Sequence, residues 1–431
     1  MGIIRTLIKK FNNFFCESSN VTVATSASAH SAPASSTPAH PVFSYSVPAY
    51  TITAVANKEY RPSVPQGGWL AQVSRDEEES VERTVYNRNG EALALDSRLE
   101  LTSGGEGIIY EYPHNNRYLI KIYKKSVFAS SEKKSRFTEQ MRTMINADMY
   151  EIFRKNNFLA WPQMPVYDMN RQVIGFVMKK CNGKSLGMLK NPAWISKNFP
   201  GWDRMNLAKT ALDFVRKVRF LAENGIFVND FNPENFLVDE KCNVSFIDCA
   251  SFQVLAEGGK CHTTGTFFAS HVAPELVLQP QKLLCPRNIH QVEFGTAIVV
   301  FNILMYGLHP YSYYDFNRNS GCADPDTNLK KGRCPLGINS DCKFPAGNWQ
   351  KHWSWLTYKL KSSFIKTFRD GHQNPDARAS LTELEKNLCD LICVMKQDSN
   401  YDRRSLSPAK VKKREYEGSQ EKAELLFQKK Y

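Results

Sequence analysis

The sequence predicts an α+β fold in which a small, strand-rich part precedes a larger helical part. Two turn signals stand early in the chain: Asn89-Gly90 between β-prone arms, and a glycine-rich turn between Leu101 and Tyr110. Leu207 to Asn224 then repeats apolar residues at helical spacing. A short hairpin over 236–247 interrupts the helical part and has an acid at each end, which makes it the first place to look for chemistry.

The composition indicates a soluble, cytoplasmic enzyme with appended segments. At 431 residues, 42% hydrophobic and 23% charged, the chain is long enough for one two-lobed core or two domains, plus tails. No stretch reaches the roughly 18 to 20 apolar residues of a membrane helix, and Phe294 to Leu308 predicts a buried core helix instead. Eleven cysteines without C-x-x-C spacing favour reduced thiols. The net charge of +13 is spread along the chain, and we expect no nucleic-acid partner.

Residues 1–16 predict an amphipathic segment at a membrane surface. Their apolar side chains fall near helical spacing, with basic residues among them. Gly2 satisfies a short N-myristoylation pattern, and Cys16 offers a second acylation site. We therefore expect a peripheral membrane contact; a docking helix or a frayed terminus is the alternative interpretation.

Residues 17–81 predict a flexible linker. From Ser18 to Asn57 the chain has no Lys, Arg, Asp or Glu, and such a composition cannot bury enough surface to offset its ordering entropy. We expect an ordered domain over 82–395, with an N-lobe to about residue 180 and a C-lobe over 181–395. A charged, solvated tail is expected over 396–431.

The glycine-rich turn suits a phosphate group. Gly104, Gly105 and Gly107 stand in this turn, and the strand that follows contains Ile109. Because glycine has no Cβ, backbone N–H groups can close over phosphate oxygens. Lys121 lies inside the next predicted strand, where an ammonium group can neutralise phosphate charge.

The acids around the short hairpin suit phosphoryl transfer. That reaction needs a carboxylate that accepts the proton of an attacking hydroxyl, and ligands that hold magnesium on the phosphate oxygens. Asp230, just before the first strand, fits the first role, and Asn235 and Asp248 fit the second. A surface hairpin with incidental acids is the alternative.

The order of these motifs over roughly Leu101 to Leu388 resembles that of the eukaryotic-like Ser/Thr protein kinases. After the glycine-rich turn and the lysine come D-F-N-P-E-N from Asp230 to Asn235, I-D-C-A-S-F-Q from Ile247 to Gln253, and A-P-E ending at Glu275. The pattern is most similar to bacterial forms with D-x-N-x-x-N and I-D-x-x-S-F-Q. Arg378 stands where the family has a buried arginine that pairs with the glutamate of A-P-E.

The resemblance implies a two-lobed protein-kinase-like fold and ATP- and Mg²⁺-dependent phosphorylation of Ser/Thr hydroxyls on proteins, the chain itself included. Asp230, Lys121 and Asn235 are the implied catalytic residues, and Asn235 and Asp248 the implied metal ligands. The implied nucleotide-binding residues are Gly104, Gly105, Gly107, Ile109, Lys121, Glu139, Met178 at the gatekeeper position, and Lys179 and Cys181 in the hinge between the lobes.

A helical region predicted from Ser130 to Lys155 is implied to supply the glutamate that positions Lys121. Glu139 lies at about the spacing of the family, and Glu132 is the competitor.

Other positions depart from the family pattern. Asn229 replaces the arginine before the catalytic acid, and Cys249-Ala250 replaces Phe-Gly after the metal acid. Without the arginine, a phosphate on Thr263 or Thr264 lacks its usual partner, so we expect activity without such phosphorylation. The catalytic acid, the amide and the metal acid are all present, which favours an active enzyme over a catalytically weak pseudokinase scaffold.

A small-molecule phosphotransferase of the aminoglycoside or choline type is the other alternative. Such enzymes also have an acid, an amide and then I-D without a following glycine, as in Asp248-Cys249-Ala250. They lack an A-P-E segment with its arginine partner, so Glu275 and Arg378 favour the protein kinase.

Overall fold

A computed structural model describes residues 83–113, 115–146, 149, 152–153, 156–255, 261–262, 269–279, 286–312, 324–337 and 348–412. These residues all belong to one compact unit. The predictions for residues 1–16 and 17–81, and those for Thr263 and Thr264, lie outside the described residues.

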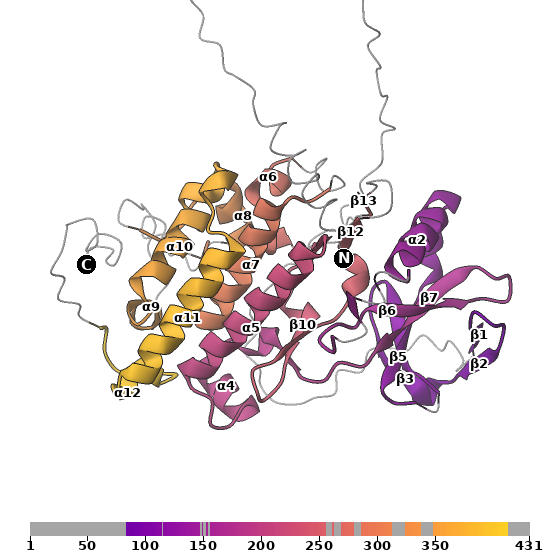
Figure 1. Ribbon diagram of the computed structural model, residues 1–431, viewed down its shortest axis with the longest axis horizontal. Coiled ribbons are helices and arrows are strands. Elements are labelled where there is room, and N and C mark those ends of the chain that lie inside the picture. Colours follow the sequence, from indigo (N-terminus) through magenta and orange to yellow (C-terminus); the bar gives the residue numbers. More distant parts are fainter. Residues whose placement is uncertain are drawn as a thin grey trace, which may run out of the picture. The chain divides into compact units, whose positions relative to one another are not determined.

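A seven-stranded antiparallel sheet comes first in the chain (Figure 1). Alternate side chains of its strands face opposite sides, so Ile120 and Ile122 join a small apolar cluster while Lys121 and Tyr123 face the other way. The Asn89-Gly90 turn prediction is confirmed, since Gly90 has a left-handed φ of +86° between the first two strands. In spatial order the strands are β2 (Ala92–Leu95), β1 (Arg83–Tyr86), β6 (Pro162–Tyr167), β7 (Val173–Lys179), β5 (Tyr118–Tyr123), β4 (Gly107–Glu111) and β3 (Glu100–Ser103).

One helix, α2 (Ser131–Met144), packs against this sheet. Ser130 caps it by accepting a hydrogen bond from the backbone N–H of Lys133. The helical region predicted over 130–155 is interrupted: α2 ends at Met144, and of the described residues beyond it Met149, Ile152 and Phe153 are helical again. Between them the side chain of Asn146 accepts from the N–H of Met149, as a cap residue does. Its buried residues are Phe137, Gln140, Met141 and Met144.

The helical part is built around α5 (Arg204–Glu223) and α7 (Ile289–Leu304). Each begins at a capping box, with Asp203 and Asn288 as the cap residues. The prediction of a buried core helix is confirmed, because α7 is buried along nearly its whole length. No described helix is long and apolar enough to cross a bilayer.

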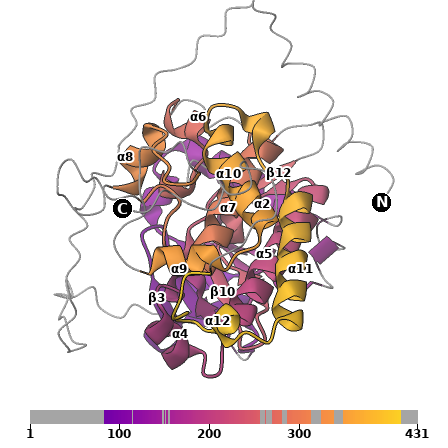
Figure 2. The same ribbon diagram turned by 90° about the vertical axis from the view of Figure 1, so that its left-hand side faces the viewer.

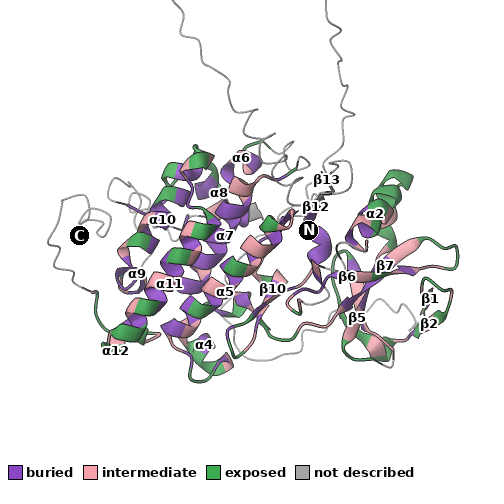
Figure 3. Ribbon diagram, viewed as in Figure 1, coloured by how far each residue is buried: buried purple, intermediate pink, exposed green. Residues whose placement is uncertain are grey.

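The other helices cover these two. Figure 2 shows α11 alongside α5, and Figure 3 shows that the exposed faces of these helices point away from the core. The predicted α+β class is thereby confirmed, with a sheet region followed by a helical region. The covering helices are α4 (Pro192–Asn198), α6 (Pro274–Val277), α8 (Pro325–Lys330), α9 (Trp349–Ser354), α10 (Tyr358–Phe368), α11 (Leu381–Gln397) and α12 (Tyr401–Arg404).

Two three-stranded sheets lie within the helical part. The hairpin predicted over 236–247 is confirmed, with Phe236 paired opposite Phe246. Asn235 and Asp248 therefore flank the two ends of one hairpin, which brings them close in space. The first sheet has the order β11 (Val244–Phe246), β10 (Phe236–Val238), β8 (Lys184–Ser185), and the second β13 (Cys261–His262), β12 (Gln253–Leu255), β9 (Ile226–Phe227).

Residues 398–412 pack against the helical part, contrary to the solvated tail that their charge predicted. The side chain of Arg403 is only 2% exposed, donates to Asp398 at 2.8 Å and lies over the ring of Trp355. The Trp355 indole in turn donates to the carbonyl of Lys410 at 3.1 Å. A guanidinium can be buried where a carboxylate and an aromatic face compensate it, which charge composition does not show.

Candidate active site

Two predicted site residues, Asp230 and Asn235, are joined by a side-chain hydrogen bond just before β10. Asp230 is 6% exposed, and its two carboxylate oxygens accept from the Asn235 side-chain amide at 3.0 Å and from the backbone N–H of Asn232 at 3.2 Å. Because the amide nitrogen of Asn235 is used in this bond, its Oδ1 is the atom available to a cation. One carboxylate therefore sets the orientation of the neighbouring amide.

Asp248 has an unusual backbone conformation at the end of β11. Its φ of 54° and ψ of 37° lie in the left-handed region, which costs a non-glycine residue on the order of 1–3 kcal/mol. The Asp248 carbonyl accepts from both the N–H and the hydroxyl of Ser251, at 3.0 and 2.9 Å. Upstream, the N–H of Ile247 donates to the carbonyl of Asn235 at 2.9 Å. These bonds fix the turn that carries Asp248 and tie it to Asn235.

Lys121 reaches Asp248 from the sheet. Its ammonium donates to Asp248 Oδ1 at 2.5 Å, and the two side chains are 11% and 26% exposed. Burial alone would lower the pKa of Lys121, but Tyr123 and the charge of Asp248 outweigh it, so the pKa is raised. The structure thus brings a charged lysine of β5 onto the predicted metal acid of the helical part.

The polar side chain on the buried face of α2 is Gln140. Its amide donates to the carbonyl of Ala250 at 2.6 Å, whereas Glu132 and Glu139 are exposed. The structure therefore brings Lys121 to Asp248 rather than to either of the glutamates expected to position it. Gln140 was missed because the resemblance directs attention to acidic residues, although its place on the buried face of the helix was a usable signal.

The glycine-rich turn is closed by a hydrogen bond from the N–H of Gly104 to the carbonyl of Gly107, at 2.9 Å. A Cβ on Gly105 would meet no atom within 4 Å, so the turn is open at this point. A Cβ on Gly107 would lie 2.6 Å from the carbonyl of Ile122, so this glycine is needed for strand contact. The strand that follows places Ile109 opposite Lys121.

The predicted hinge residues lie where the sheet ends. Met178 is 4% exposed, while Lys179 and Cys181 are partly exposed. The N–H of Lys180 donates to the carbonyl of Arg117 at 2.8 Å, which attaches the hinge to the sheet. Burial raises the pKa of the Cys181 thiol to about 11, so this side chain stays protonated at neutral pH.

The ring of Phe231, the residue after Asp230, packs against α7 at Gly295. A Cβ built on Gly295 would lie 2.3 Å from the ring of Phe231, so only glycine allows this ring to approach the helix. Sequence reasoning missed Gly295. The available signal was a glycine inside an otherwise apolar helical pattern, which often marks a close contact.

The segment after Asp248 is held by side-chain amides. Asn229 donates to the carbonyl of Ser251 at 3.0 Å. Gln253 makes two bonds to the backbone of Arg287: its amide donates to the carbonyl at 3.1 Å, and its Oε1 accepts from the N–H at 2.5 Å. Gln253 ends the I-D-C-A-S-F-Q motif and Asn229 directly precedes Asp230, so these two side-chain amides fix the backbone around the two motifs.

The Glu275–Arg378 pair is confirmed. The guanidinium makes two bonds to the carboxylate, at 2.9 and 2.7 Å, and its side chain is 0% exposed. It also donates to the carbonyls of Gly371 and His290, at 2.9 and 3.0 Å. Burial would raise the pKa of Glu275, but the hydrogen bonds and charge of Arg378 lower it. The pair joins the end of the A-P-E segment to the beginning of α7.

The oxygen donors of this site suit Mg²⁺. Asp248 offers a carboxylate and Asn235 a side-chain carbonyl oxygen, which are the hard ligands that Mg²⁺ takes. Lys121 and the open turn at Gly105 suit the negative charge of a triphosphate. The residues present therefore fit ATP with magnesium.

Comparisons with known proteins point to the same class. The chain is 30% identical over 233 residues to Protein kinase YegI of Escherichia coli O157:H7, and 31% identical over 232 residues to Protein kinase YegI of Escherichia coli strain K12. Each match covers 53% of this chain but only 34% of the relative, so it spans about a third of the length of each curated protein. No protein-family model matches the chain. The homology confirms the resemblance to protein kinases that the motifs indicated.

Proposed function

We propose that this protein is an ATP- and Mg²⁺-dependent protein kinase that phosphorylates Ser/Thr hydroxyls, those of its own chain included. The observation that carries the proposal is the convergence of three groups: Asp230 bonded to Asn235, Asn235 tied to the strand of Asp248, and Asp248 paired with Lys121. The homology to Protein kinase YegI supports it.

In the proposed mechanism Asp230 orients the attacking hydroxyl and accepts its proton. Asn235 Oδ1 and the Asp248 carboxylate would hold Mg²⁺, which supplies charge neutralisation at the phosphate oxygens when bound. Lys121 is charged and already placed beside Asp248, so it can shift its bond from this carboxylate to the α/β-phosphates. Gln140 holds α2 against the segment after Asp248 during this exchange.

The nucleotide contacts are proposed at both ends of the sheet. Gly104, Gly105 and Gly107 would cover the phosphates, with the open position at Gly105 leaving room for them. Met178 would lie behind the adenine, and backbone groups from Lys179 to Cys181 would bind its edge. Glu139 is exposed, so we do not retain it as a nucleotide-site residue.

The proposal is tested with purified full-length protein, labelled ATP and Mg²⁺, followed by identification of the phosphorylated residues. We expect label on serine or threonine of this chain or of an added protein substrate. Label transferred to aminoglycosides or choline-like alcohols but to no protein would instead identify a small-molecule phosphotransferase. Nucleotide binding without any transfer would indicate a pseudokinase scaffold.

We also propose that the protein is cytoplasmic and reaches a membrane surface through residues 1–16. A single myristoyl chain on Gly2 binds only marginally, so the basic residues or an acylated Cys16 must contribute. Deletion of residues 1–16 should move the protein from the membrane fraction to the supernatant, and Gly2→Ala should do so in part. An unchanged distribution after the deletion would refute the membrane contact.

A further inference from the structure

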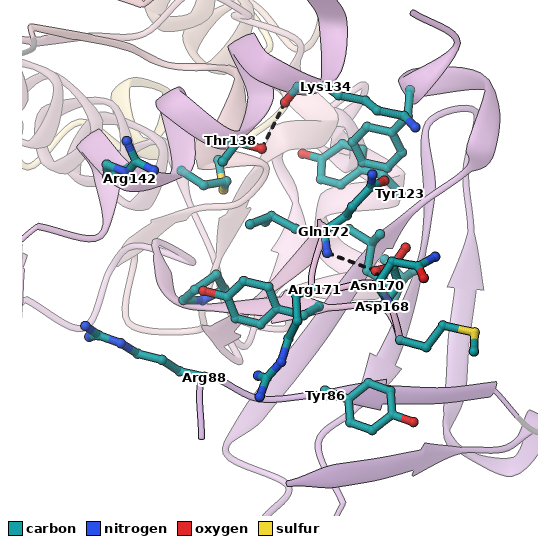
Figure 4. Close-up of a pocket in the computed structure, with 18 of the residues that line it drawn as sticks. Tyr86, Arg88, Tyr123, Lys134, Thr138, Arg142, Asp168, Asn170, Arg171 and Gln172 are labelled. Carbon is teal, nitrogen blue, oxygen red and sulfur yellow. Dashed lines mark hydrogen bonds between the residues drawn. The ribbon is translucent and has the colours of Figure 1, made fainter. Parts of the chain in front are cut away.

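A groove of about 1510 Å³ lies between α2 and the strands β1, β6 and β7, and neither Asp230 nor Asp248 lines it (Figure 4). Its volume exceeds the roughly 300–1,000 Å³ of ordinary small-molecule pockets. A segment of polypeptide is a better match for such a space than a metabolite.

The rim of the groove is strongly basic. Six cationic side chains line it, against two acidic ones, Glu139 and Asp168, and Asp168 already accepts from two backbone N–H groups of its own turn. Within the described part of the chain none of the six cations takes part in an ion pair. They are Arg83, Arg88, Lys125, Lys134, Arg142 and Arg171.

These cations come from both walls. Figure 4 shows Lys134 and Arg142 on α2, and Arg88 and Arg171 on the strand side. Arg171 has a left-handed φ of 58°, and its guanidinium lies against the backbone of Gly90, so two hairpin turns meet at this rim. An anionic chain in the groove would therefore meet positive charge on both sides.

The groove also has apolar lining residues, here called its floor. They are Met141, Pro165, Met169, Val173 and Ile174, of which Met169 is 81% exposed. Apolar contact area combined with a ring of charge suits a peptide in which acidic residues flank apolar ones. Neither a bare anion nor a purely apolar helix would use both features.

We propose that this groove binds an acidic peptide segment of a partner protein. Charge complementarity selects the partner, and the apolar floor anchors one or two of its side chains. The bound segment would contact Tyr123, whose ring centroid lies 4.9 Å from the ammonium of Lys121, and α2, which carries Gln140. The partner would thus sit one side chain away from the Lys121–Asp248 pair.

The test is direct binding by fluorescence anisotropy, using the full-length protein and a labelled decapeptide of Asp and Glu with two Phe residues. A peptide with Asn and Gln in place of the acids is the ligand control. We expect saturable binding of the acidic peptide only, weakened by salt. ATP is absent, so the result does not depend on the proposed transfer activity.

The groove variant is Arg88→Glu with Lys134→Glu and Arg142→Glu. It should weaken the binding of the acidic peptide by at least about tenfold in Kd, because each change turns an attraction into a repulsion. The matched control is Lys209→Glu with Lys386→Glu and Lys396→Glu, which changes the net charge by the same amount at exposed positions of α5 and α11. It should raise the Kd for the acidic peptide by less than about threefold. Far-UV circular dichroism of both variants checks that they fold.

Equal weakening by both variants would show unspecific attraction to a basic protein and overturn the proposal. So would the absence of saturable binding at low salt. Binding that appears only after Asp76, Glu77, Glu78 and Glu79 are changed to amides would assign the groove to this acidic run of the same chain, and would overturn the assignment to a partner.

Discussion

Replacing Asp248 by Ala should reduce phosphoryl transfer by at least about 10³-fold, and replacing Asp230 by Ala by about 10²- to 10⁴-fold. The reasons differ. Asp248→Ala removes a proposed metal ligand and the carboxylate beside the buried ammonium of Lys121, so it should weaken Mg²⁺-dependent nucleotide binding as well as transfer. Asp230→Ala removes the proposed base and should leave nucleotide binding closer to that of the unchanged protein.

Initial rates with labelled ATP, together with nucleotide titration in the presence and absence of Mg²⁺, separate these two effects. Glu240→Ala is the matched control, since Glu240 is an exposed acid in the turn of the same hairpin, and it should change the rate less than about twofold. Transfer by Asp248→Ala at near the unchanged rate with Mg²⁺ would exclude Asp248 as a metal ligand.

Arg378→Met should lower the free energy of unfolding by about 3–5 kcal/mol, because it leaves Glu275 without the guanidinium that compensates its charge. Two backbone carbonyls, of Gly371 and His290, lose their donors as well. We expect a drop in Tm on the order of 10 °C, measured by thermal unfolding. The double variant Arg378→Met with Glu275→Leu should recover part of this loss, since it removes the unpaired carboxylate.

The Arg216–Glu385 ion pair is the surface-exposed control for the buried Glu275–Arg378 pair. The Arg216 side chain is 53% exposed and bonds Glu385 at 2.8 Å, so Arg216→Met should cost less than about 1 kcal/mol. If Arg378→Met were as mild as Arg216→Met, the Glu275–Arg378 pair would not hold the A-P-E segment to α7.

Much of the site could be predicted because local signals fix its parts. A strand–turn–strand pattern places Asn235 and Asp248 at the two ends of one hairpin whatever surrounds it, and strand alternation places Lys121 on one face of the sheet. The Glu275–Arg378 pair joins residues 103 positions apart, so no local signal predicts it, and its prediction came from the family resemblance.

Gln140 shows where such prediction fails. Successive residues of a helix differ by about 100° in direction, so an error of one position turns an inward side chain outward. Glu139 and Gln140 are such neighbours. The apolar spacing of α2 places Gln140 on the buried face with Phe137 and Met141, but the resemblance directed attention to the acid beside it. The burial of Arg403 has no such local signal, since it depends on the ion pair with Asp398 and on the ring of Trp355.

The bond from Gln140 to Ala250 is also a contact of the site that does not change with pH. The Gln140 amide donates to a carbonyl oxygen at 2.6 Å, and an amide neither gains nor loses a proton in the physiological range. A glutamate of the same shape could only accept when ionised, so it would repel this carbonyl until it took up a proton, and the position of α2 would then follow the pH. With glutamine the contact is the same in acid and in base. The attachment of α2 to the segment after Asp248 is therefore independent of pH at this bond.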